Sequence, residues 1–116
     1  MQISAENARQ LKIKLGAVKR TTKEYLYYFD EKTREEKRLQ SMKESNQDAY
    51  DIKQQENVVQ ETCVMIPATK KSLEEHLGGL QTFVQELGES LVPGTEQKEE
   101  VDSILKAAGD ALADSA

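Results

Sequence analysis

The residues that could carry out chemistry in this chain are few and lie far apart. His76 is the single histidine and Cys63 the single cysteine among 116 residues. Thirteen positions separate the two, so they do not assemble a metal cluster. Glu74 and Glu75 are adjacent and point to different faces of a helix, so they do not form the carboxylate pair of an acid–base site. We therefore predict neither catalytic nor metal-binding residues.

The glycine pair in the stretch LGGL, residues 77–80, is the remaining candidate for ligand binding. It lacks the Lys-Ser/Thr ending and the preceding strand of a phosphate-binding loop. Gly78 and Gly79 are better explained as a weak point in a helix, each costing up to about 1 kcal/mol. Cys63 falls in an apolar series and is interpreted as a small core residue, not as a nucleophile. We expect a protein that is not an enzyme and takes no cofactor.

Charge is distributed unevenly along the chain, whose formal net charge is −5. Residues 1–46 hold 11 Lys/Arg against 7 Asp/Glu, whereas residues 47–116 hold 5 against 14. Residues 9–23 are basic without a single acid among them. Such a stretch can bind an acidic partner. The alternative is a solvated helix face that is neutralised by the acidic half of its own bundle.

The elements that position these residues are helices. Apolar residues recur at spacings of three and four across the first segment, which predicts a helix over residues 4–43. Thr95 can cap a third helix over residues 96–112, after the turn signal VPGTEQ. Between them, one heptad series predicts a second helix over residues 48–90: Ile52, Val59, Ile66, Leu73, Leu80 and Leu87. We assign it a companion series on the same face: Glu56, Cys63, Lys70, Leu77, Val84 and Leu91.

Helices of this length joined by short polar links fold most simply in one way. We expect a single all-α domain, residues 1–116, built as an elongated antiparallel three-helix bundle, spectrin-like and up-down-up. At 1.5 Å per residue, the rod is roughly 60 Å long.

Pro67 stands inside the second predicted helix. An interior proline loses one backbone hydrogen bond and clashes with the carbonyl four residues back, at a cost of about 3 kcal/mol. The heptad register nevertheless continues through it, and neither Gly nor Asn stands nearby to end a helix. We therefore predict that Ile66 and Pro67 bend one continuous helix. As a hypothesis, the bend gives the bundle a curved binding face.

Aromatic residues and leucine crowd five consecutive positions, 25–29, which is more than one helical stripe can bury. Exposed aromatics beside Lys and Arg are typical anchors of protein interfaces. The alternative is that the rings cover the end of the short third helix. The predicted partner-binding residues are Lys12, Lys19, Arg20, Lys23, Tyr27 and Tyr28.

Two long stretches of the chain resemble the tubulin-binding cofactor A family. They read LKIKLGAVKRTTKEYLYY and DAYDIKQQENVVQETCVMIPATKKSLEE. The resemblance covers roughly residues 8–91 in order and spacing, and the Ile-Pro pair within a heptad helix is its most specific element. The glycine-rich HLGGL and the connection LGESLVPGTE depart from the family's pattern. The matching positions are residues 13–14, 16–20, 23–24, 50–54, 60–61 and 65–67.

The resemblance implies a three-helix bundle and a role without catalysis. It implies that the chain captures β-tubulin intermediates after their release from the cytosolic chaperonin, and holds them for later tubulin-folding cofactors that assemble the αβ heterodimer. It also implies a cytoplasmic, cytoskeleton-associated protein that is a monomer or a weak homodimer.

Two other functions remain open from the residues. The heptads would equally serve a generic coiled-coil adaptor or complex subunit that self-associates strongly. Nucleic-acid binding by the basic stretch is disfavoured by the net charge and by the lack of a binding motif. No apolar stretch approaches the ~20 residues of a membrane span, so no membrane partner is expected. One cysteine forms no internal disulfide, which suits a reducing cytosol.

Overall fold

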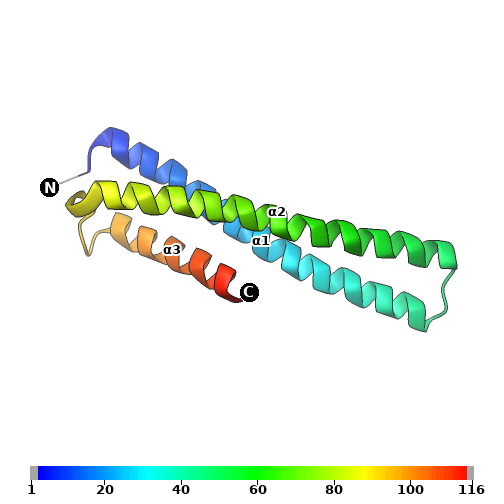
Figure 1. The fold of residues 1–116 in the computed structure, drawn as a ribbon. Coiled ribbons are helices and arrows are strands. Elements are labelled where there is room, and N and C mark those ends of the chain that lie inside the picture. The colour runs from blue at the N-terminus through cyan, green and yellow to red at the C-terminus, as the bar shows by residue number, and fades with distance from the viewer. Residues whose placement is uncertain (1–2, 115–116) are drawn as a thin grey trace.

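The computed structural model describes residues 3–114 and shows an elongated helical rod (Figure 1). Its helices are α1, Ala5–Glu44; α2, Ala49–Leu87; and α3, Glu96–Asp114, with a short 3-10 turn, η1, Gly88–Ser90, after α2. No strand occurs within residues 3–114. The rod measures 67 × 21 × 20 Å. The predicted all-α helical bundle is confirmed.

Local hydrogen bonds fix where α1 begins and ends. The Ser4 hydroxyl oxygen accepts a bond of 3.1 Å from the Asn7 N–H and so caps the first turn. At the other end Asn46 adopts a left-handed φ of 55°. The Gln47 N–H then donates to the Met42 carbonyl at 3.1 Å, the Schellman pattern that satisfies the last carbonyls of a helix. This tight turn makes α2 antiparallel to α1.

The second helix continues through Pro67 and through both glycines of the LGGL stretch. It ends at Leu87, because Gly88 has a φ of 52° that favours glycine. The residues up to Ser90 form η1, so the α-helix is shorter than the predicted 48–90. The Pro67 side chain lies on the exposed side of α2, where its missing N–H is cheapest. The bend at this proline stays a prediction.

The hydrophobic core occupies one part of the rod. The core ends at the half-buried Phe29 of α1 and the half-buried Ile66 of α2. No apolar residue from 30 to 65 belongs to it. We call residues 3–29 and 66–114 the three-helix body and residues 30–65 the two-helix arm. Within the body, α3 packs against both α1 and α2. The fully or nearly buried apolar residues are Leu11, Leu15, Val18, Tyr25, Leu73, Leu80, Leu87, Leu91, Val101, Ala108 and Ala111.

The predicted heptad series changes character between body and arm. Leu73, Leu80 and Leu87 are buried in the body, whereas the arm members Ile52 and Val59 are only half-buried. No third helix covers the arm, so its seam has one open side (Figure 1).

The companion series was assigned wrongly in this half of α2. Its members Glu56, Cys63 and Lys70 are exposed or half-buried. The buried positions are one residue earlier, at Gln55, Thr62 and Thr69. Threonine is tolerated there because its hydroxyl donates to its own helix, as Thr62 does to the Val58 carbonyl at 3.0 Å. The side-chain amide of Gln55 donates to the Glu35 carboxylate at 2.6 Å and to its carbonyl at 3.0 Å. These bonds satisfy polar groups that a purely hydrophobic pattern does not predict.

Candidate partner-binding surface

The four predicted basic residues all lie exposed on α1 within the three-helix body. Among residues 3–114, every ion pair joins two residues of the same helix. None of those pairs includes Lys12, Lys19, Arg20 or Lys23. The acidic residues of α2 and α3 therefore do not neutralise this face by direct contact. This finding disfavours the alternative of a face that is neutralised within its own bundle.

Two other cations of the basic stretch do have partners. The Arg9 guanidinium pairs with the Glu6 carboxylate at 3.0 Å. The Lys14 ammonium lies 5.4 Å from the centre of the Phe83 ring on α2, within the range of a cation–π contact. The sequence pattern does not distinguish these cations from one another. The structure shows that Arg9 and Lys14 have partners, whereas the four predicted residues form no ion pair within residues 3–114.

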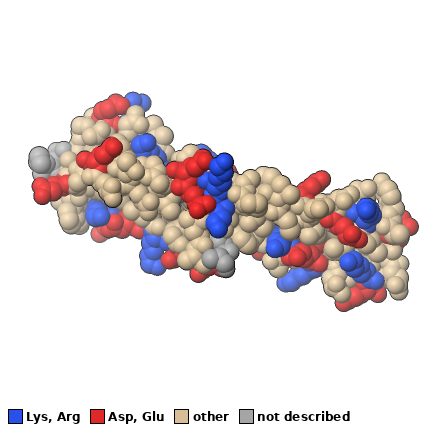
Figure 2. All heavy atoms as spheres, in the orientation of Figure 1, with Lys and Arg blue, Asp and Glu red and all other residues tan. Residues whose placement is uncertain are grey.

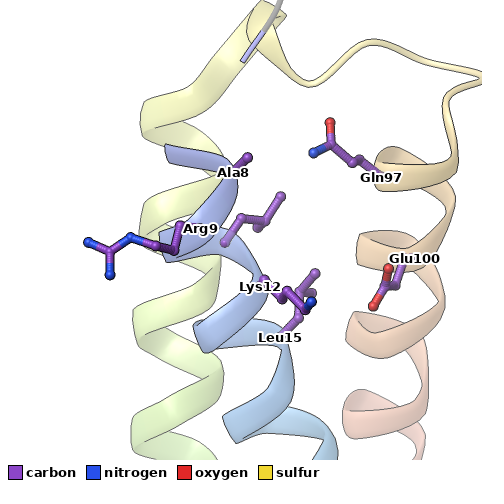
Figure 3. A pocket seen from close by; sticks show the side chains of 7 residues that line it. Ala8, Arg9, Lys12, Leu15, Gln97 and Glu100 are labelled. Carbon is purple, nitrogen blue, oxygen red and sulfur yellow. The ribbon is translucent and has the colours of Figure 1, made fainter. Parts of the chain in front are cut away.

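A groove runs between the first turns of α1 and α3 (Figure 3). It has a volume of about 450 Å³ and is lined from α1 by Leu11, Lys12 and Leu15, among others. Gln97 and Glu100 line it from α3. In Figure 3 the Lys12 and Glu100 side chains both extend into the gap, although no ion pair joins them, whereas Arg9 points away from α3. Lys12 therefore shares its groove with an acidic residue.

A second groove of about 290 Å³ lies further along the same two helices. Its α1 side carries Lys19 and Lys23 around the exposed Leu26, which keeps 47% of its surface in water. Its α3 side carries no acidic residue. We call this site the lysine-flanked groove; it is lined by Lys19, Thr22, Lys23, Leu26, Ser103, Ile104 and Ala107.

The aromatic cluster is divided between core and surface. Tyr25 is 1% exposed and packs edge-to-face on Phe29, with ring centres 5.1 Å apart. Tyr27 is 54% exposed and packs edge-to-face on the half-buried Tyr28 at 5.4 Å. The prediction that the five positions cannot all be buried is confirmed, since Leu26 also faces solvent.

Tyr27 is tied to charged neighbours on its own helix. Its ring lies 5.9 Å from the Arg34 guanidinium carbon. A hydrogen bond with Glu31, and the charge of that carboxylate, raise the pKa of Tyr27. In turn, hydrogen bonds from Arg34 and Tyr27 lower the pKa of Glu31. The structure brings Lys19 and Lys23 together in one groove and places Lys12 in the other. Arg20, Tyr27 and Tyr28 line neither of these two α1–α3 grooves.

A further apolar area lies at the middle of α2. Val64 is 63% exposed and Met65 39% exposed, beside the exposed Pro67. Figure 2 shows few charged atoms over the middle of α2 on the face in view. This area adjoins the boundary between body and arm.

The remaining candidates for chemistry are His76 and Cys63. Among the described residues, no group of three or more His, Cys, Asp or Glu side chains is placed to hold a metal ion. His76 is exposed and Cys63 is a half-buried free thiol. Within residues 3–114, none of the helices combines the length and apolarity that crossing a membrane requires.

Sequence reasoning missed the residues that build the lysine-flanked groove. Leu26 lies in the crowded run at positions 25–29 but is not among the predicted binding residues, and residues 103–107 are predicted only as part of the third helix. The groove depends on how far α3 is shifted along α1, which no single-helix pattern specifies. The available signal was an apolar residue three positions after Lys23 on a helix, where both lie on the same side.

The chain is similar to a known family and to several known proteins. Residues 6–107 match the family model described as tubulin binding cofactor A. The tubulin-folding cofactor A of Arabidopsis thaliana is 40% identical over 104 residues, covering 88% of each chain. The tubulin-specific chaperone A of Homo sapiens is 38% identical over 77 residues, 66% of this chain and 71% of the human protein. The crystal structure of the Arabidopsis cofactor superposes with a TM-score of 0.82 at 34% identity, covering 92% of this chain and 99% of the other.

Proposed function

We propose that this chain, which belongs to the tubulin-binding cofactor A family, binds β-tubulin folding intermediates after their release from the chaperonin. Membership of the family makes it a tubulin-folding cofactor, a chaperone and not an enzyme. The proposal adds the β-tubulin subunit, the folding stage and the hand-over to later tubulin-folding cofactors. It also places the chain in the cytoplasm with the cytoskeleton, as a monomer or weak homodimer.

The observation that carries the proposal is the set of unpaired cations on α1. Lys12, Lys19, Arg20 and Lys23 remain in solvent although the other two helices are rich in acids. Holding like charges on one face without counter-ions costs stability, and an acidic partner surface would recover that cost. We propose these four residues, with Tyr27 and Tyr28, as partner-binding residues.

The shape of the candidate surface suits a holding role. The grooves of the described residues lie open along helix seams, and the candidate binding residues occupy a length of helix rather than a pocket. A long convex or flat face can cover a partly folded chain without enclosing it. Binding therefore depends on several weak contacts, which later cofactors can displace one after another.

The direct test is native co-migration of the purified chain with newly translated β-tubulin in a lysate that contains the chaperonin. A discrete complex with β-tubulin, and none with newly translated α-tubulin or actin, is the expected result. A well-folded chain that retains no β-tubulin would refute the proposal and favour a general coiled-coil adaptor.

A further inference from the structure

We propose that the lysine-flanked groove is the docking site for one acidic amphipathic helix of the partner, which lies along the seam between α1 and α3. This inference rests on the proposed function and names the element of the partner that is recognised. It assigns binding to α3 as well as to α1, and to apolar contact as well as to charge.

Both helices contribute an apolar residue to the groove. Leu26 is 47% exposed, and the half-buried Ile104 faces it from α3. Ser103 and Ala107 are small, so a partner can approach the α3 side closely. About 290 Å³ accommodates a few apolar side chains but not a folded domain. The seam between two parallel helices forms a groove, and the side-chain ridge of a helix from the partner can pack into it.

The charges around the groove favour an occupant that carries negative charge. Lys19 and Lys23 line the α1 side and form no ion pair within residues 3–114. On α3, Asp102 pairs with Lys98 at 2.9 Å and Asp110 with Lys106 at 3.0 Å, so these acids are already occupied. No acidic residue lines the groove itself. An incoming helix with Asp or Glu beside its apolar stripe would meet two free ammonium groups.

The neighbouring groove lacks these properties. There Lys12 extends toward Glu100 across the gap (Figure 3), so an acidic helix would meet a carboxylate as well as an ammonium group. The site lined by Ile13, Lys14 and Glu75 on the α1–α2 side likewise mixes both signs. Charge complementarity therefore selects the lysine-flanked groove over the other grooves along α1.

The first test compares two substitutions on α1, each of which replaces an exposed aliphatic residue by aspartate. Leu26→Asp introduces an acid into the groove, and we expect the affinity for newly translated β-tubulin to fall at least tenfold. Ile13→Asp is the matched control, since Ile13 is 57% exposed on α1 and lines a different groove. Its affinity should stay within about twofold of wild type. Equal affinity for the Leu26 variant and wild type would overturn the inference.

The second test separates local charge from net charge. Lys19→Glu with Lys23→Glu should weaken binding about tenfold and reduce its salt dependence. Lys37→Glu with Lys53→Glu makes the same change in net charge on exposed residues of the arm, and should leave binding unchanged. Equal losses of affinity in the two double variants would mean that binding depends only on the net charge of the chain, and would refute the docking site.

The identity of the occupant is tested in a chain that keeps all its charges. A photo-reactive phenylalanine replaces Leu26, or Tyr50 as a control at the far end of the arm, where the side chain is 67% exposed. Mass spectrometry should place the Leu26 cross-link in an acidic helical segment of β-tubulin. A cross-link to a basic or extended segment, to nucleic acid or to a second copy of this chain would contradict the proposal. If the wild-type chain retains no β-tubulin at all, the proposed function itself fails.

Discussion

The three-helix body and the two-helix arm are both built on α1 and α2 but have different interiors. In the body, leucines fill the seam and Leu73 and Leu80 are 0% exposed. In the arm, Gln55 and Thr62 are among the buried residues, and the apolar seam residues are half-buried. The difference follows from α3, which covers only the body (Figure 1). A helix pair without a third member cannot enclose large apolar side chains, so hydrogen-bonded polar residues replace some of them.

Two exposed features lie on opposite sides of the same boundary. The lysine-flanked groove belongs to the body, whereas the ion pairs of Arg34 with Asp30 and Glu31 belong to the arm. The part of the rod with the buried apolar core carries the lysine-flanked groove. A surface held by a well-packed core loses little entropy on binding.

The largest expected effect is on the stability of the core. Leu73→Ala in the body should lower the free energy of unfolding by about 2–5 kcal/mol, because it leaves a cavity in a fully buried site. Ile52→Ala in the half-buried arm should cost only about 1–2 kcal/mol. Urea denaturation followed by far-UV circular dichroism measures both. Similar losses in the two variants would show that arm and body are packed equally well.

Pro67 marks the boundary and is expected to lower stability. Pro67→Ala restores a backbone hydrogen bond and should raise the free energy of unfolding by about 1–3 kcal/mol. If the predicted bend shapes the binding face, affinity for β-tubulin falls in the same variant. Gly78→Ala is the control: an added Cβ meets nothing within 4 Å, so it should stabilise α2 by about 1 kcal/mol without touching the proline. Unchanged affinity in the Pro67 variant would show that the proline has no role in shaping the binding face.

Gln55 should matter to the arm alone. Gln55→Ala removes both bonds to Glu35 and should cost about 1 kcal/mol, seen as faster amide hydrogen exchange in residues 30–65. The exposed neighbour Gln54 provides the control, and Gln54→Ala should leave exchange unchanged. Faster exchange throughout the body would contradict the separation of the two regions.

The smallest effect concerns pH. Because hydrogen bonds from Arg34 and Tyr27 lower the pKa of Glu31 from its ordinary value, the stabilisation that this carboxylate provides is present above the unfolded-state pKa. It is lost as the pH falls through the folded-state value. Glu31→Gln should therefore flatten, slightly, the fall in melting temperature between about pH 5 and pH 3. A steeper fall in the variant would contradict the assignment.

The helices themselves could be predicted because spacing alone carries the signal. Leucine at every seventh position of α2 indicates a seam, whatever lies opposite. The buried residues of the arm could not be predicted. Thr62 and Gln55 are polar, and a hydrophobic pattern assigns them to the surface unless their hydrogen-bond partners are known. Likewise Lys23 could be proposed from charge, whereas its neighbour Ile104 depends on the alignment of α3 with α1. Contacts between helices are the information that one-dimensional periodicity lacks.

The most direct test of the binding surface is amide hydrogen exchange of the chain with and without bound β-tubulin. The account predicts new protection in residues 12–26 of α1 and residues 103–107 of α3, with residues 30–58 exchanging as in the free chain. Protection confined to residues 30–58, with the body unchanged, would contradict it and move the binding surface to the arm.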